Sequence, residues 1–230
     1  MKAKEIREKF KIDHGRMIID IIKTRTEDEI EEVKQYYEEL ESKFASDKRR
    51  LSKRYDEKVR NGKLSLEIQY QLNEYFSEEY YIIENIFLKA FRYSIIVTIY
   101  SLLESSLNNL CHFLHNLKKL TLSLEELRGA GIERAKLYLT KVCLIDFSEN
   151  SNEWNEILKL NKIRNCIVHA QGDILNTKNP NKLRKIVAKT TGIGLESRRF
   201  IKIKSEYINT TLYNTKKLLE AVYDKSFDTV

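Results

Sequence analysis

The chain contains little proline and little glycine, with one proline and seven glycines in 230 residues. Because these two residues mark most tight turns, their scarcity argues against a sheet-rich fold. The length fits one large domain, or a compact domain with a long arm, better than a chain of small modules. Apolar residues make up 42% of the chain and charged residues 33%, enough for a core and a broad solvated surface. We therefore expect a folded, all-α protein.

Cysteine is also scarce, and its spacing argues against the common cysteine frameworks. Cys111, Cys143 and Cys166 lie far apart and form no C-x-x-C pair, so neither a disulfide framework nor a zinc knuckle is indicated. The N-terminal segment is charged throughout, and the longest uncharged apolar run, 93–103, is about half of the roughly 20 residues that a membrane-spanning helix needs. We expect a soluble protein in a reducing cytoplasm, with no membrane partner.

Several familiar catalytic motifs are missing as well. The sequence has no Walker loop, no G-x-G-x-x-G, no H-E-x-x-H and no G-x-S-x-G. His112 and His115 are three residues apart, but packed or surface roles are favoured over a metal pair. We expect no cofactor and no metal. The formal net charge of +7 points to a polyanionic partner, without choosing among RNA, DNA and an acidic membrane surface.

The first part of the chain is expected to form a long charged helical hairpin. From residue 27 to about residue 60, apolar residues recur at steps of three and four in a densely charged background, and Asn61–Gly62 supplies a stop. The next helical region runs from 66 toward 120 without glycine or proline, so we expect a break near 77–82 and a first piece that folds back on the arm. Such a hairpin is more often a structural extension or dimerisation element than a grip for nucleic acid.

The remainder, residues 81–230, is expected to form the helical domain, with residues 1–80 as the arm. The segment 82–120 is apolar almost all round and predicts the central core helix. Further helices are expected over 133–147, over 152–170 with Gly172 as the breaker, and over 205–223. Between 178 and 204, nine basic residues stand against the single acid Glu196. This basic C-terminal segment is interrupted by Pro180 and two glycines.

The helix expected over 152–170 carries the most informative residues. Asn161, Asn165 and His169 step by four and form a polar stripe beside an apolar face, as expected for a helix that lines a cleft. Arg164 points toward apolar positions, where an unpaired charge would be costly. Its expected partner is Glu104, which is set inside the apolar core helix, or alternatively a phosphate held by the guanidinium fork.

Two readings of these residues remain open from spacing alone. Arg164 and His169 are about 140° and roughly 7.5 Å apart on an ideal helix, so one copy makes an awkward pocket. Two copies across a twofold axis would share a cleft with an arginine and a histidine from each. Imidazole exchanges protons near neutral pH and arginine supplies fixed positive charge, which suits RNA cleavage without a metal. The other reading is a buried arginine paired with Glu104 and a histidine that caps or packs.

The residues Arg164-Asn165-Cys166-Ile167-Val168-His169 resemble the signature of the HEPN superfamily, which is an arginine, a polar residue, three further residues and a histidine. The apolar helix 93–110 with its embedded acid adds to the likeness, which spans about 82–189. The resemblance implies a HEPN-like helical bundle and a dimeric, metal-independent endoribonuclease of toxin–antitoxin, abortive-infection or other antiviral systems. Arg164 and His169 would then be the catalytic pair, and Asn165 would orient them. Some such toxins continue the motif as His-x-Tyr, whereas this chain has Gln171.

We expect RNA as substrate, a homodimer, and an antitoxin or defence-system partner. The basic residues expected to bind the RNA backbone are Lys159, Lys162, Lys182, Arg184, Lys185, Arg198 and Arg199. The alternative is a non-catalytic HEPN-like module that binds RNA, a nucleotide or a partner protein.

Overall fold

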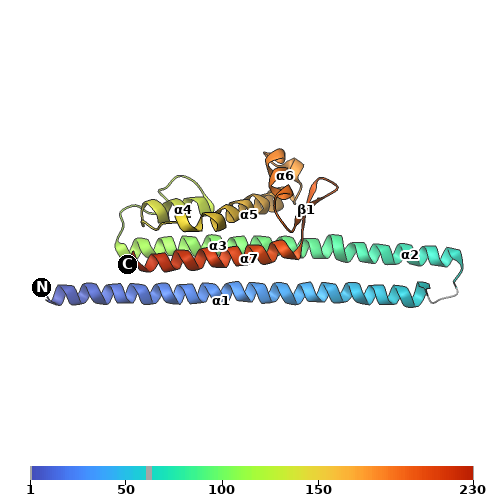
Figure 1. Ribbon diagram of the computed structural model, residues 1–230, viewed down its shortest axis with the longest axis horizontal. Coiled ribbons are helices and arrows are strands. Elements are labelled where there is room, and N and C mark those ends of the chain that lie inside the picture. Colours follow the sequence, from blue (N-terminus) through green and yellow to red (C-terminus); the bar gives the residue numbers. More distant parts are fainter. Residues whose placement is uncertain (1, 61–63, 230) are drawn as a thin grey trace.

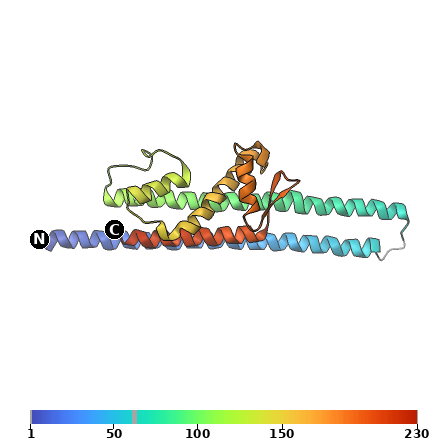
Figure 2. The same ribbon diagram turned by 45° about the horizontal axis from the view of Figure 1, so that its top comes forward.

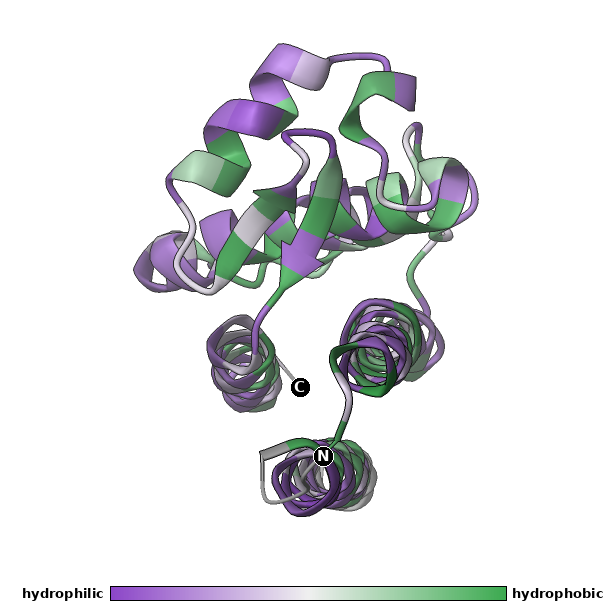
Figure 3. Ribbon diagram, turned by 90° about the vertical axis from the view of Figure 1, so that its right-hand side faces the viewer, coloured by the Kyte–Doolittle hydropathy of each residue, from purple (hydrophilic) through white to green (hydrophobic). Residues whose placement is uncertain are grey.

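The computed structural model describes the backbone of residues 2–60 and 64–229, and the side chains of residues 14–59 and 64–229. The protein is all-α, as expected, apart from one small β-hairpin. Three long helices run side by side: α1 (Lys2–Tyr55), α3 (Leu88–Lys118) and α7 (Ser205–Phe227) (Figure 1). Viewed end-on, the three long helices lie together and all the smaller elements pack on one side of them (Figure 3).

The smaller elements form a second layer over α3 and α7. They are α4 (Gly131–Lys141), α5 (Ser151–Ala170), α6 (Pro180–Ala188), and the strands β1 (Ile193–Glu196) and β2 (Phe200–Ile203). In Figure 2 this layer covers only part of the length of the long helices. Beyond it, α2 (Leu66–Tyr81) continues the line of α3 and runs back along the distal end of α1 (Figures 1 and 2).

Helix α3 is the centre of the core, as its apolar sequence predicted. Twelve of its side chains are buried, among them Ile96, Leu103 and Leu107 at full burial. They contact α1, α4, α5 and α7, so apolar residues on every side of the helix find a protein neighbour. Within the described residues, the helical run Leu66–Lys118 passes a length-and-composition test for a membrane span, but 39% of that window is buried. A core helix of a water-soluble protein passes the same test.

Helix α1 differs from the expected arm in its start. It begins at Lys2 instead of residue 27, because the segment before residue 27 already packs on the domain. Ile19 is fully buried, and the Thr26 hydroxyl lies 3.1 Å from the Tyr223 hydroxyl of α7. Ile30 and Tyr37 join the same apolar core as α3 and α7. The boundary at residue 80 therefore does not separate two cores. Only α2 and the end of α1 that faces it, called the distal hairpin below, project beyond the domain (Figure 1). The stop at Asn61–Gly62 lies outside the described residues.

The break expected near 77–82 does not occur. The helix stays continuous from Leu66 to Lys118, with a π-helical segment at Ile82–Phe87 between α2 and α3. A π-turn inserts an extra residue without breaking the backbone hydrogen-bond ladder, so the helical faces rotate while the axis continues. The first piece does fold back on α1, as expected.

The β-hairpin within the basic segment was not predicted. Its strands pair antiparallel, with Leu195 opposite Ile201. Ser197 and Arg198 both take left-handed φ values, 49° and 59°, and the Arg199 N–H donates to the Glu196 carbonyl at 3.0 Å. Three residues, Ser197 to Arg199, connect the strands, and the left-handed positions of such a turn are usually asparagine or glycine. The hairpin was missed because Ser197 and Arg198 are not residues that typically indicate such a turn.

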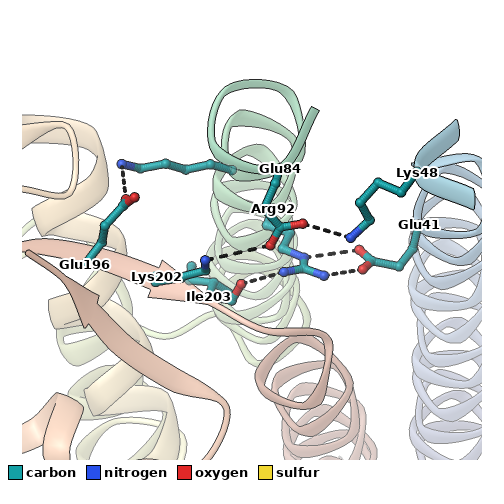
Figure 4. Close-up of polar contacts among 8 residues, drawn as sticks. Glu41, Lys48, Glu84, Arg92, Glu196, Lys202 and Ile203 are labelled. Atoms are coloured by element: carbon teal, nitrogen blue, oxygen red, sulfur yellow. Dashed lines mark hydrogen bonds and ion pairs between the residues drawn. The ribbon is translucent and has the colours of Figure 1, made fainter. Parts of the chain in front are cut away.

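A polar network joins the β-hairpin to α1 and α3 next to the distal hairpin (Figure 4). Arg92 of α3 forms a two-point ion pair with Glu41 of α1, and its Nη1 donates a 2.9 Å hydrogen bond to the Ile203 carbonyl. Glu84 lies 2.8 Å from the Lys48 ammonium and 3.7 Å from that of Lys202. These contacts fix β2 and the start of α7 against α1 and α3.

Candidate functional site

Helix α5 places the motif residues, and its C-terminal end is held by specific backbone bonds. The helix ends at Ala170, as expected, two residues before Gly172. Gln171 is left-handed, with φ 52°, and the Gly172 N–H donates to the Cys166 carbonyl at 3.0 Å. The Gln171 N–H donates to the same Cys166 carbonyl, so both amides that follow the helix are paired with its end. His169 therefore lies on a well-defined last turn.

His169 and Asn165 line one pocket, of about 560 Å³, between α5 and α6. His169 is exposed, and it forms no hydrogen bond or ion pair with any described residue. Three lysines share the pocket: Lys162 from α5, Lys178 from the loop before α6, and Lys182 from α6. Residues apart in sequence thus bring a free imidazole and three ammonium groups to one hollow. That combination sets a side chain able to accept or donate a proton beside a surface that attracts phosphate.

Arg164 faces away from this pocket, toward α3. Its guanidinium carbon lies 4.7 Å from the centre of the Tyr100 ring, a cation–π contact. Its Nη1 donates a 3.0 Å hydrogen bond to the Asn165 Oδ1, whose Nδ2 donates in turn to the Asn161 Oδ1 at 3.0 Å. The Arg164 Nε is buried and has no hydrogen-bond partner among the described residues. Within one protomer, Asn165 is the link between Arg164 and the His169 pocket.

The ion pair expected between Arg164 and Glu104 is not formed between these two described residues. Tyr100 takes the place next to Arg164 instead. Burial and, to a smaller extent, the Glu104 carboxylate raise the pKa of the Tyr100 hydroxyl to about 12, and Arg164 opposes the shift. Glu104 lies under the start of α4, where a Cβ added to Gly131 would come within 2.9 Å of its Oε1. The ring of Tyr100, and not the carboxylate of Glu104, is therefore the neighbour of Arg164 on α3. The spacing of residues along α5 alone could not predict this contact.

The seven basic residues expected to bind RNA do not form one patch. Lys162 and Lys182 meet at the His169 pocket, where Lys178, not singled out beforehand, joins them. Lys159 forms a 2.6 Å ion pair with Glu156 at an adjacent hollow. Lys178 belongs to the basic segment 178–204. Its position two residues before Pro180, which begins α6, was the sequence signal that could have placed it near the pocket.

The other four basic residues lie away from the His169 pocket. Arg184 and Lys185 are exposed on α6, and Arg198 is exposed in the hairpin turn. Arg199 has a different role from the expected one, because it donates two hydrogen bonds to the buried carboxylate of Asp173. Its guanidinium is thereby committed to an internal contact.

The His169 pocket opens into a longer groove along α5. A second hollow of about 620 Å³ shares Lys162, Lys182 and Ile186 with the first. A third, of about 200 Å³, shares Glu156 and Lys159 with the second and reaches α7. The three hollows follow α5 from its C-terminal end toward its N-terminal end. Their continuity gives an extended ligand a path away from His169.

The other two histidines singled out from sequence have protein partners. His112 Nε2 lies 3.5 Å from a Glu125 oxygen at the surface. His115 Nδ1 lies 3.1 Å from the Tyr138 hydroxyl. No cluster of three or more histidine, cysteine or acidic side chains suited to a metal occurs among the described residues.

Comparison with protein-family models, curated proteins and solved structures found no match for this chain. What the protein does must therefore be inferred from its residues and their geometry.

Proposed function

We propose that the protein is a metal-independent endoribonuclease of the HEPN type, acting in the cytoplasm as a homodimer in toxin–antitoxin or antiviral defence. The observation that carries the proposal is the free, exposed His169 in a hollow lined by Lys162, Lys178 and Lys182. A histidine that only packs or caps does not explain why three lysines without acidic partners among the described residues gather around it. An RNA backbone supplies the missing negative charge.

The proposed reaction is attack by a ribose 2'-oxygen on the neighbouring phosphorus. The bond from phosphorus to the 5'-oxygen breaks, so the products are a 2',3'-cyclic phosphate and a 5'-hydroxyl. His169 exchanges a proton with the reacting oxygens, as the base for the 2'-hydroxyl or the acid for the departing 5'-oxygen. Positive charge stabilises the phosphorane-like transition state.

Arg164 supplies that charge in a composite site made by two copies. In a single protomer it lies against Tyr100, while Asn165 holds its Nη1 and also borders the His169 pocket. The buried Nε of Arg164 has no partner among the described residues, and it can donate to a phosphate oxygen only when the guanidinium turns from Tyr100 toward the second copy. A twofold axis close to α5 would bring Arg164 of each copy toward His169 of the other. Asn165 then acts as the residue that positions the guanidinium.

The test is cleavage of a total RNA or tRNA pool in EDTA by the wild type and by His169→Ala and Arg164→Ala. We expect both variants to lose at least about a hundredfold in rate, the usual scale for loss of a proton-transfer group or a charge-stabilising donor. Lys141→Ala is the matched control, since this exposed lysine of α4 lies outside the groove. Equal cleavage by wild type and His169→Ala would overturn the proposal.

A second candidate function is a non-catalytic module that binds RNA or a nucleotide. The stacking of Arg164 on Tyr100 within its own protomer favours it, because this contact satisfies the guanidinium without any substrate. The two functions differ in one measurement. A wild type that binds RNA but leaves it intact in EDTA, in the same way as His169→Ala, is a binding module.

A further inference from the structure

The distal hairpin carries an unusual share of exposed apolar side chains. Of the 17 large hydrophobic residues exposed in the described part of the chain, eight lie between residues 66 and 87. Leu66, Tyr70 and Tyr81 are 85%, 69% and 55% exposed. On a helix these three fall within about 60° of each other, so they share one face of α2. Single exposed apolar residues are ordinary, but such a concentration marks an interaction surface.

A groove runs between α1 and α2 beside this face. It has a volume of about 430 Å³, with the buried side chains of Leu51 and Phe76 among its lining residues. Ser52 and Ser77, one from each helix, are small and leave room for an incoming side chain. A pair of helices has no third layer to cover its apolar side, and no other described element extends over this part of the hairpin (Figures 1 and 2).

The charges of the two helices are opposite. Residues 66–87 contain five glutamates and no basic residue, a formal charge of −5. Residues 43–58, at the end of α1 and in the π-helical turn that follows it, contain seven basic and three acidic residues, a formal charge of +4. Between these two segments the described residues form one ion pair, Lys48–Glu84. Glu74 and Glu78 of α2, and Arg54 of α1, have no ion-pair partner among the described residues. The hairpin thus carries complementary charges that it does not neutralise internally.

We propose that the occupant of this surface is the distal hairpin of a second copy of the chain, so that two hairpins form a four-helix bundle. A twofold axis sets the acidic α2 of each copy against the basic α1 of the other, and repeats the favourable pairing twice. The aromatic face of α2 then enters the partner's groove beside Phe76. Glu67, Glu74 and Glu78, which lie beside the aromatic face on α2, oppose a nucleic acid or an anionic membrane as occupant. The proposal concerns a contact between the distal hairpins, whereas the proposed nuclease rests on a contact near α5, so each contact can fail without the other.

The first test is the oligomeric state of the full chain with the aromatic face removed. We expect the wild type to have twice the chain mass of 27.3 kDa by light scattering. Tyr70→Ser with Tyr81→Ser should raise the dimer dissociation constant at least about tenfold, as for loss of interface hot spots. The control is Tyr213→Ser, because Tyr213 is 64% exposed on α7, away from the hairpin. A monomeric wild type at about 100 µM, or a double variant that dimerises like the wild type, would overturn the proposal.

The second test uses the charges and separates this interface from any other. One variant carries Glu74→Lys and Glu78→Lys, and the other carries Arg50→Glu and Arg54→Glu; both pairs are four residues apart and share a helix face. Each variant alone places like charges across the twofold axis, so we expect at least tenfold weaker self-association. Their equimolar mixture restores opposite charges at both contacts and should form a heterodimer. If each variant self-associates like the wild type, or if the mixture stays monomeric, the proposed interface is wrong. Circular dichroism confirms that each variant is folded.

Discussion

Asp173 accepts two hydrogen bonds from Arg199 on one carboxylate oxygen, from Nε at 2.9 Å and from Nη2 at 2.6 Å. Asp173 follows the motif helix by three residues, and Arg199 lies in the hairpin turn directly before β2. Backbone bonds join the same two segments, with the Ile201 N–H donating to the Gly172 carbonyl at 2.9 Å. The hairpin therefore holds the end of α5, and with it the last turn that carries His169.

We expect Arg199→Ala to lower the melting temperature clearly more than Arg198→Ala. Loss of the guanidinium leaves the Asp173 carboxylate, which is 3% exposed, without its cation. Arg198 is the matched control because it is exposed in the same turn and forms no ion pair with a described residue. Equal melting temperatures for the two variants, measured by circular dichroism at pH 7, would contradict this role of Arg199.

The same pair makes an acid-pH prediction. The Arg199 hydrogen bond lowers the pKa of the Asp173 carboxyl below its ordinary value, so the pair stabilises the fold above that value, near 3.9. The stabilisation is lost as pH falls below about 4 and through the lowered pKa. The difference in stability between wild type and Arg199→Ala should therefore shrink in urea titrations as the pH falls below about 4.

The elements with a clear period could be predicted from the sequence. The apolar stretch that became α3, the motif helix α5 and the closing helix α7 were all expected close to their observed bounds. Each buries a periodic apolar face, which is the strongest signal available to a single sequence. The start of α1 was missed because its charged first half buries few side chains, such as Ile19, and these depend on α7 some 200 residues away.

The site was only partly predictable, for the same reason. Spacing along α5 correctly placed His169 and Asn165 on one side and Arg164 on another. The contacts of Arg164 depend on α3, where its guanidinium lies over the ring of Tyr100 and forms no ion pair with Glu104. Tertiary neighbours of this kind are set by how helices cross, which periodicity does not encode.

Cys166 lines the His169 pocket, and we expect its thiol to be unreactive in the native protein. Burial and, to a smaller extent, the Asp173 carboxylate raise the pKa of the Cys166 thiol to about 11. Since the thiolate is the reactive form, iodoacetamide at pH 8 should leave Cys166 unlabelled in buffer and label it in urea. Labelling in buffer should increase only as the pH approaches 11. Rapid native labelling at pH 8 would show that the thiol is ionised and accessible.

RNA binding should depend on salt through the pocket lysines. The logarithm of the association constant for single-stranded RNA should fall with the logarithm of salt concentration, and each phosphate contact contributes a slope of about 0.7. Replacing Lys162, Lys178 or Lys182 by glutamine should reduce the slope by about that amount per residue. Lys141→Gln should leave it unchanged, because Lys141 is exposed on α4 outside the groove. Fluorescence anisotropy at several salt concentrations measures the slopes, and equal slopes for all four variants would place the RNA elsewhere.

Gly172 is required by both its backbone conformation and its neighbour. Its φ is +80°, and an added Cβ would lie 2.1 Å from the Tyr93 hydroxyl, which donates to the Ile201 carbonyl. A side chain in the left-handed region costs about 1–2 kcal/mol, and the displaced Tyr93 adds to that cost. We therefore expect Gly172→Ala to destabilise the fold by at least about 2 kcal/mol in urea unfolding.

The control for Gly172→Ala is Gly194→Ala in β1, where an added Cβ meets no atom within 4 Å. Its stability should stay within about 0.5 kcal/mol of the wild type. Because Gly172 follows His169 by three residues, Gly172→Ala should also slow RNA cleavage under conditions where the variant is still folded, whereas Gly194→Ala should not. A Gly172→Ala protein as stable and as active as the Gly194→Ala protein would mean that the end of α5 tolerates a different path, and that the position of His169 does not depend on this turn.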